Sequence, residues 1–315
     1  MYSNLIVPVD HGNRNIKTEN FVFTSGLSES DTRPPFGEYL FYQNKFYTLT
    51  DQRIPYMRDK TADERFFILT LFAIAKEAKR RELVTGRDLL KVQLPVGLPP
   101  KHYGALYEKF ENYFCREEII SYSISGQDYH VRIEDVMAFP QDYAAAITQY
   151  QKISGYHKVI VIDIGGFTLD YVMIREGSVD LSVCDSLEYG VIKLYNKITS
   201  RVNSEHDILL EDMDIDGILR GKETDYPGSV TDTVKGMTQS YADDLLGTLR
   251  ERGIDLKSGC VVFVGGGSLL LREYLENSDK VGKSLFVTDI KANAKGYGLL
   301  YGMQKKAGAA YGKKE

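Results

Sequence analysis

A short pattern occurs twice in this chain, once near its start and once near its middle. In each copy an apolar run ends in Asp-x-Gly, at residues 10–12 and again at 163–165. Each aspartate is followed seven positions later by a charged residue, Lys17 or Asp170, and the copies lie 153 positions apart in a chain of 315 residues. A strand, a glycine turn and a second strand predict a β-hairpin. Two such hairpins predict two lobes that face one ligand, and a phosphate chain with its metal fits best.

The length and the order of elements predict the organisation of the chain. A single core stops growing at about 250–300 residues, so two domains are expected. We expect a first lobe over residues 1–145, with a small insertion at about 21–87, completed by a C-terminal helix at 291–315. The second lobe is expected over 146–290. Strands that alternate with helices predict an α/β architecture with largely parallel sheets covered by helices.

Charge and cysteine content exclude several classes of protein. The net charge is −5, so direct binding to nucleic acid or to an anionic membrane is not expected. Cys115, Cys184 and Cys260 are far apart and odd in number, which fits reduced thiols better than a disulfide framework or a zinc site. No segment reads as a secretion signal or a membrane span. The expected protein is soluble and cytoplasmic.

Asp10 and Asp163 each close an apolar strand, where a lone buried carboxylate is costly. A hydrated Mg²⁺ between these carboxylates and a triphosphate explains both positions, so both are expected to hold the metal through water. Backbone N–H groups at the glycines, neutral side-chain donors and the Lys17 ammonium would bind phosphate oxygens. Each Asp-x-Gly could also be only a tight turn, because turns favour Asp and Gly. This alternative accounts for a single copy, but it does not account well for two copies in one chain. The nucleotide-binding residues expected here are Asp10, Gly12, Asn13, Asn15, Lys17, Gly165, Gly166, Phe167 and Thr168.

A glycine turn at residues 265–267 lies between the apolar run 260–264 and an expected helix, with Ser268 as its N-cap. Such a turn could hold an adenine and its α-phosphate at the helix N-terminus. It is not the dinucleotide fingerprint, because Leu270 stands in the place of the third glycine. Gly265, Gly266, Gly267 and Ser268 therefore complete the expected nucleotide-binding set.

Capping patterns set two helix boundaries. Thr61 followed by Glu64 reads as a capping box and predicts a helix that reaches about Arg81. A long helix is expected from about Val234 to Arg252, because Gly253 has the position of a C′ glycine.

A calcium-loop pattern runs from Asp212 to Glu223. The exiting helix of an EF-hand would be broken by Pro227. The favoured alternative makes Asp212 to Asp216 the acidic first turn of a short helix that includes Leu219.

Taken together, these residues resemble the actin-like ATPase superfamily of actin, Hsp70 chaperones and sugar kinases. Residues 10–17 and 163–170 resemble its two phosphate loops, and 262–271 its adenosine loop. Residues 139–146 and 292–298 resemble its two connecting helices. The resemblance implies a two-lobe α/β fold, a duplicated ribonuclease H-like unit, with the nucleotide in the cleft between lobes.

Within the superfamily, residues 94–99 and the loop 163–170 look most like bacterial ParM-type plasmid-segregation actins. The resemblance implies a homopolymer filament that hydrolyses ATP, or GTP, with Mg²⁺. It also implies DNA segregation through a ParR-like DNA-binding adaptor. By the same resemblance, Gln141 positions the attacking water, and Asp163 helps to bind the metal and to activate that water.

Other functions remain open at this stage. A non-polymerising small-molecule kinase of the same fold would need a substrate pocket, for which the insertions are short. A cell-shape or cell-division actin would need a membrane-anchoring helix, and an Hsp70-like module would need a peptide-binding domain. His11 and Phe167 depart from the best-known members and leave nucleotide preference open.

Overall fold

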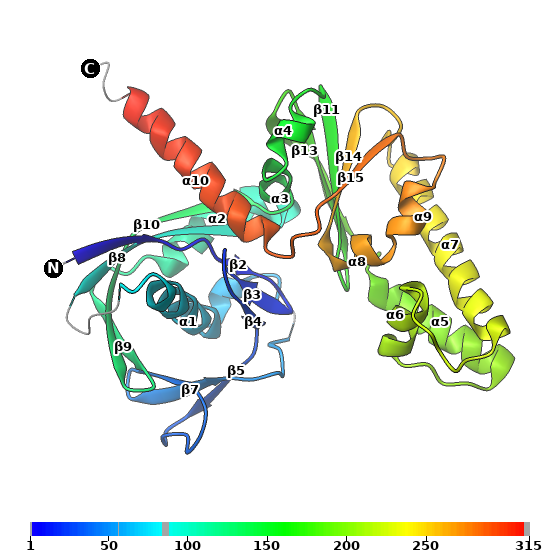
Figure 1. The fold of residues 1–315 in the computed structure, drawn as a ribbon. Coiled ribbons are helices and arrows are strands. Elements are labelled where there is room, and N and C mark those ends of the chain that lie inside the picture. The colour runs from blue at the N-terminus through cyan, green and yellow to red at the C-terminus, as the bar shows by residue number, and fades with distance from the viewer. Residues whose placement is uncertain (1, 56, 84–87, 312–315) are drawn as a thin grey trace. The chain divides into compact units, whose positions relative to one another are not determined.

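The computed structural model describes residues 2–55, 57–83 and 88–311. Two compact units form the chain (Figure 1). Unit 1 comprises Met1–Thr148 and Lys291–Glu315, and unit 2 comprises Gln149–Ile290. The last four residues of the expected C-terminal helix, 312–315, lie outside the described residues.

Unit 2 is built on one five-stranded sheet with the strand order β13-β12-β11-β14-β15. The first three strands pair antiparallel, whereas β14 and β15 continue the sheet in parallel from β11. The strands are β11 (Lys158–Ile164), β12 (Leu169–Arg175), β13 (Ser178–Leu187), β14 (Cys260–Val264) and β15 (Lys283–Phe286). The helices are α4 (Tyr150–Ile153), α5 (Val191–His206), α6 (Asp212–Leu219), α7 (Gly228–Glu251), α8 (Gly265–Leu270) and α9 (Arg272–Glu276).

Unit 1 contains a seven-stranded sheet, β1-β8-β10-β9-β6-β7-β5, and a three-stranded sheet, β2-β3-β4. Its strands are β1 (Tyr2–Ile6), β2 (Asp10–His11), β3 (Asn15–Lys17), β4 (Val22–Thr24), β5 (Leu27–Ser30), β6 (Tyr39–Tyr42), β7 (Lys45–Leu49), β8 (Leu89–Leu98), β9 (Ile120–Ile124) and β10 (Gln127–Pro140). Its helices are the short 3₁₀ helix η1 (Lys60–Ala62), α1 (Arg65–Arg80), α2 (Pro100–Phe114), α3 (Tyr143–Ile147) and α10 (Ala292–Tyr311).

The two units share one strand order. In unit 1, β1 pairs in parallel with β8, and Val9 forms a further parallel bridge with Val96, so β1 and β2 follow one path along β8. Pro8 interrupts this path, but Val7 N and Val9 N on either side of it still donate to β8. When β1 and β2 are counted as one strand, unit 1 has the strand order β4-β3-β2/β1-β8-β10. This order repeats the order β13-β12-β11-β14-β15 of unit 2. The repeat expected from the two hairpins is therefore a repeat of topology.

The expectation of largely parallel sheets is wrong. Both sheets are mixed, because each hairpin adds antiparallel strands to a parallel pair. The insertion in unit 1 also joins the edge of its sheet through the antiparallel strands β6, β7 and β5 (Figure 1).

Buried apolar strands and helix faces supply the cores. All five residues of β14 are buried, as its uninterrupted apolar sequence predicts for a central strand. Helix α1 is buried along most of its length, including Phe67, Leu71 and Phe72. A helix that is apolar around most of its surface is stable only when other elements cover it on several sides.

Two helices begin at other residues than expected. Asp59, not Thr61, is the N-cap, because its carboxylate accepts the Thr61 N–H at 3.0 Å and starts the short helix η1; α1 then begins at Arg65. Helix α7 begins at Gly228, before the expected Val234, since its first turns are polar and carry little apolar periodicity.

The expected end of α7 is confirmed. Gly253 has φ +79° and donates to Arg250 O, while Ile254 N donates to Leu249 O, the pair of bonds of a Schellman motif.

Helix α10 packs closely on the start of α3 and on β8. A Cβ at Gly296 would overlap the backbone carbonyl of Ala144, and the Tyr297 ring occupies the space that a Cβ at Gly97 would need. Tyr297 is fully buried and stacks on Phe139 with ring centroids 6.3 Å apart. Helix α10 is thus fixed to the segment that follows β10.

Among the described residues, no helix combines the length and the apolar character needed to cross a membrane.

The close approach of α10 predicts a contrast between two of its glycines. Gly296→Ala should lower the free energy of unfolding by about 2–3 kcal/mol, because a backbone carbonyl cannot move aside as a side chain can. Gly302→Ala, at a position where a Cβ meets nothing within 4 Å, should be neutral or stabilising by up to about 1 kcal/mol. Urea denaturation followed by circular dichroism measures both. Equal effects of the two substitutions would contradict the packing described.

Candidate functional site: two phosphate-loop hairpins

The hairpin of unit 1 places a buried carboxylate beside a lysine. Strands β2 and β3 pair antiparallel with Asp10 opposite Lys17. The Lys17 ammonium lies 3.2 Å from Asp10 Oδ2, and the Asp10 side chain is nearly fully buried. A Cβ at Gly12 would stand 2.7 Å from Asn15 O, so the turn closes tightly only with glycine.

Gln141 is brought to the same carboxylate from more than a hundred residues away. Its side-chain amide Nε2 donates to Asp10 Oδ1 at 3.1 Å, and its backbone N–H donates to Leu98 O at 2.8 Å. The next residue, Asp142, has φ +62°, and its N–H donates to Asn293 Oδ1 at 2.9 Å. The beginning of α10 therefore holds the backbone beside Gln141 in place.

A further cation lies at this hairpin, and no sequence pattern predicts it. Lys60, in η1, donates its ammonium to the backbone carbonyl of His11. Burial lowers the pKa of Lys60 to about 8, with Asp10 acting to raise it and Lys17 to lower it. The only signal in the sequence is a lysine that precedes a helix, which is too common to be read as a site.

His11, one of the departures from the best-known members, belongs to the core. Its ring stacks on Phe114 at 4.9 Å and meets the edge of Phe110 at 5.7 Å. Its Nε2 lies 2.8 Å from the Thr70 hydroxyl, which itself donates to Phe66 O, so Nε2 carries the proton. Burial, followed by the charge of Lys60, lowers the pKa of His11 to about 3. A neutral His11 thus anchors the hairpin to the core through its ring contacts and its hydrogen bond to Thr70.

The hairpin of unit 2 is closed by backbone hydrogen bonds. Gly165 N donates to Thr168 O at 2.8 Å, and the first amides of α5, Val191 and Ile192, donate to the carbonyls of Gly165 and Gly166. These bonds leave the loop fixed against α5. The Phe167 side chain is 45% exposed at its tip.

Asp163 and the glycine turn lie side by side in unit 2. Asp163 is the parallel partner of Val264, so the carboxyl ends of β11 and β14 bring Asp163 next to Gly265. Gly265 has φ +87°, and a Cβ there would overlap Asp163 Oδ1. A Cβ at Gly267 would stand 2.6 Å from Ile164 O. Gly265 and Gly267 must therefore be glycines, because the end of β11 lies too close to leave room for a Cβ at either position.

Ser268 is not the N-cap of the following helix. Helix α8 begins at Gly265, its N-cap is Val264, and Ser268 lies inside it with a fully buried side chain. The left-handed conformation of Gly265 allows the helix to start directly after the strand, four residues earlier than the N-cap pattern implies.

The structure thus gathers the expected residues into two sets. In unit 1, Asp10 and Lys17 contact each other, Gln141 bonds to Asp10, and the turn contains Gly12, Asn13 and Asn15. In unit 2, Asp163 lies against Gly265, beside the turn formed by residues 165–168. Each set stands at the carboxyl ends of equivalent strands, the position at which open α/β sheets bind ligands.

The donor sets fit a magnesium ion bound mainly by phosphate and water. Asp10 already accepts hydrogen bonds on both oxygens, so it would contact a metal through water. Within the described residues, no group of three His, Cys, Asp or Glu side chains could hold a metal alone. Mg²⁺ needs only one or two carboxylates when phosphates and waters complete its shell.

The calcium-loop pattern is a helix, as the favoured alternative predicts. Residues Asp212–Leu219 form α6, with Glu211 and Asp214 in a reciprocal capping box. The acidic residues therefore serve the helix N-terminus rather than an EF-hand.

Neighbouring glycines of the 265–267 turn should respond differently to alanine. Gly265→Ala should destabilise unit 2 by about 2 kcal/mol or more, because it meets both an unfavourable φ and the Asp163 carboxylate. Gly266→Ala, where a Cβ meets nothing within 4 Å, should change stability by less than about 0.5 kcal/mol. Thermal and urea unfolding of the two variants test this. A tolerated Gly265→Ala would show that Asp163 is not held as described.

Two parts of the chain match models of protein families. Residues 42–143 match the family described as actin like proteins, N terminal domain, and residues 161–277 match archaeal actin homologue MreB-like, C-terminal. A comparison with curated proteins finds no match.

Solved structures share the fold over nearly the whole chain. The archaeal actin homologue Ta0583 aligns with a TM-score of 0.73 at 16% identity, covering 93% of this chain and 97% of its own. It has also been crystallised in complex with ADP, and that structure aligns with a TM-score of 0.66.

Two further structures come from the ParM and Alp groups. The apo psk41 ParM protein aligns with a TM-score of 0.74 at 14% identity, covering 96% of this chain and 98% of its own. The Alp12 filament structure aligns with a TM-score of 0.71 at 16% identity, covering 96% and 99%. With its repeated topology, its two hairpins and these matches, the chain has the actin-like fold, and two of its parts are similar to actin-like families. The expected likeness to ParM-type actins is confirmed at the level of the fold.

Proposed function

We propose that this protein assembles into filaments when it binds ATP and Mg²⁺, and that it hydrolyses the bound ATP to ADP and phosphate. The observation that carries the proposal is the pair of equivalent hairpins, each of which ends a strand in an aspartate and turns on glycine. Ta0583, a protein of this fold, binds ADP, and Alp12, another, forms a filament. These neighbours support nucleotide binding and self-association as properties of this chain.

In this proposal both hairpins serve one nucleotide, with different duties. Lys17 neutralises phosphate charge in unit 1, and backbone N–H groups at Gly12, Gly165 and Gly166 bind phosphate oxygens. The turn at residues 265–267 accepts the adenosine part. ATP and GTP are both tested, because the sequence leaves the nucleotide preference open.

Gln141 is the proposed residue for positioning the attacking water. Its amide already donates to Asp10, and its neighbour Asp142 is fixed by Asn293, so few conformations are left to it. Asp163 is proposed to hold the metal through water and to orient the nucleophile. A bound Mg²⁺ would neutralise the charge that develops on the transferred phosphate.

The cellular task that we propose is DNA segregation in the manner of ParM-type actins, with a ParR-like DNA-binding adaptor as the link. The net charge of −5 supports an adaptor over direct DNA contact, because a protein of this charge gains little from the phosphate backbone.

Negative-stain electron microscopy tests assembly. Filaments should form with MgATP above a critical concentration, and pelleted protein should decline as phosphate is released. Gln141→Ala should slow phosphate release about 100-fold and prolong the filaments, whereas Gln151→Ala, at an exposed position in α4, should leave both unchanged. Monomers under every nucleotide and salt condition would contradict the proposal, as would an unaltered rate in Gln141→Ala.

A further inference from the structure

Lys60 has an unusual environment for a lysine. The residue is half-buried, and its ammonium donates to the His11 carbonyl and lies 5.5 Å from the centre of the Phe66 ring. It forms no ion pair with a carboxylate in the described part of the chain, whereas Lys17 is paired with Asp10. An ammonium has three N–H donors, so two of them remain for a ligand.

Charge around the first hairpin favours an anion. Lys17 pairs with Asp10, and the charge of Asp10 also acts on Lys60, so two cations lie around this carboxylate. Burial lowers the pKa of Lys60 to about 8, although the charge of Asp10 acts to raise it. At pH 7 the group is still mostly protonated. A protein does not gain stability by holding a charge in this way, which points to a function in binding.

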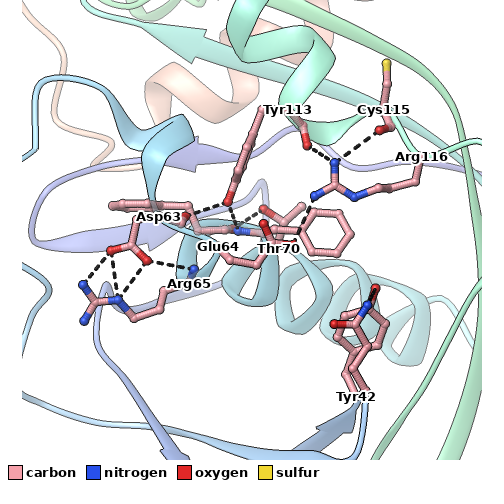
Figure 2. A network of polar contacts seen from close by, with 11 residues as sticks. Tyr42, Asp63, Glu64, Arg65, Thr70, Tyr113, Cys115 and Arg116 are labelled. Carbon is pink, nitrogen blue, oxygen red and sulfur yellow. Dashed lines mark hydrogen bonds and ion pairs between the residues drawn. The ribbon is translucent and has the colours of Figure 1, made fainter.

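The backbone that carries Lys60 is fixed from both sides. Asp59 caps η1 and pairs with Lys109 of α2 at 2.5 Å. Immediately after η1, the Tyr113 hydroxyl of α2 donates to Asp63 O and accepts from Phe67 N, both at 2.8 Å (Figure 2). These contacts hold the start of α1 against α2. Lys60 is therefore preorganised, which lowers the entropy lost when a ligand binds.

We infer that Lys60 binds the terminal phosphate of a nucleoside triphosphate, as a second cation beside Lys17. The inference rests on the proposed function. The terminal phosphate is favoured because Gln141, the proposed water-positioning residue, bonds to the same Asp10 that lies near Lys60. Phosphate oxygens would accept the two remaining N–H groups and supply the missing negative charge. A diphosphate, which lacks that group, would gain little from Lys60.

Equilibrium binding of MgADP and of a non-hydrolysable MgATP analogue tests the inference by isothermal titration calorimetry. Lys60→Met should weaken analogue binding about 10- to 100-fold, the value of a charge-assisted hydrogen bond. Binding of ADP should change less than about threefold. Arg58→Met, an exposed cation two residues earlier in the same segment, controls for general electrostatics and should alter neither affinity more than about twofold.

Lys60→Arg keeps a cation at this position and should retain more analogue affinity than Lys60→Met. If the methionine variant does not fold, the analogue and ADP affinities of Lys60→Arg are compared with those of the wild-type protein instead. Equal loss of both nucleotides, or no loss, in a folded Lys60→Met protein would overturn the inference while leaving the proposed function standing. A wild-type protein that binds neither nucleotide would overturn both.

Discussion

The buried carboxylate of Asp10 is the interaction on which the arrangement of unit 1 depends. It lies at the end of a strand path along β8, where a charged group is tolerated only with partners. Lys17 supplies the opposite charge and Gln141 a neutral donor. Because those partners come from the hairpin and from the end of β10, one carboxylate joins two distant parts of the chain. Helix α10 completes the arrangement through Asn293 and the close approach of Gly296.

In unit 2, Asp163 stands at the equivalent strand end, and the missing Cβ of Gly265 leaves room for its carboxylate. The loop at residues 165–168 is held by the first amides of α5. The same topology thus gives one hairpin that is rich in cations and one that is rich in backbone groups.

How far the sequence alone leads depends on the range of each interaction. The two hairpins and the apolar strand β14 follow from local patterns, since strand alternation and glycine turns are written within about ten residues. Gln141 is a candidate only through family resemblance, because nothing local in residues 139–146 specifies it, and its contact with Asp10 is seen only in the structure. The place of Lys60 beside the first hairpin cannot be predicted locally, because His11, Asp10 and Lys17 lie more than forty positions earlier. The sequence pattern predicts Ser268 as an N-cap because such turns are common strand-to-helix connections, whereas Gly265 lets α8 begin directly after β14.

In the proposed function, Asp10 and Asp163 serve a single nucleotide. Isothermal titration of MgATP into the wild-type protein and into Asp10→Asn and Asp163→Asn tests this, under conditions that prevent assembly. We expect one nucleotide per chain, and a loss of affinity in each variant that is not simply additive when the two are combined. Two nucleotides per chain would contradict it, and so would normal affinity in either single variant.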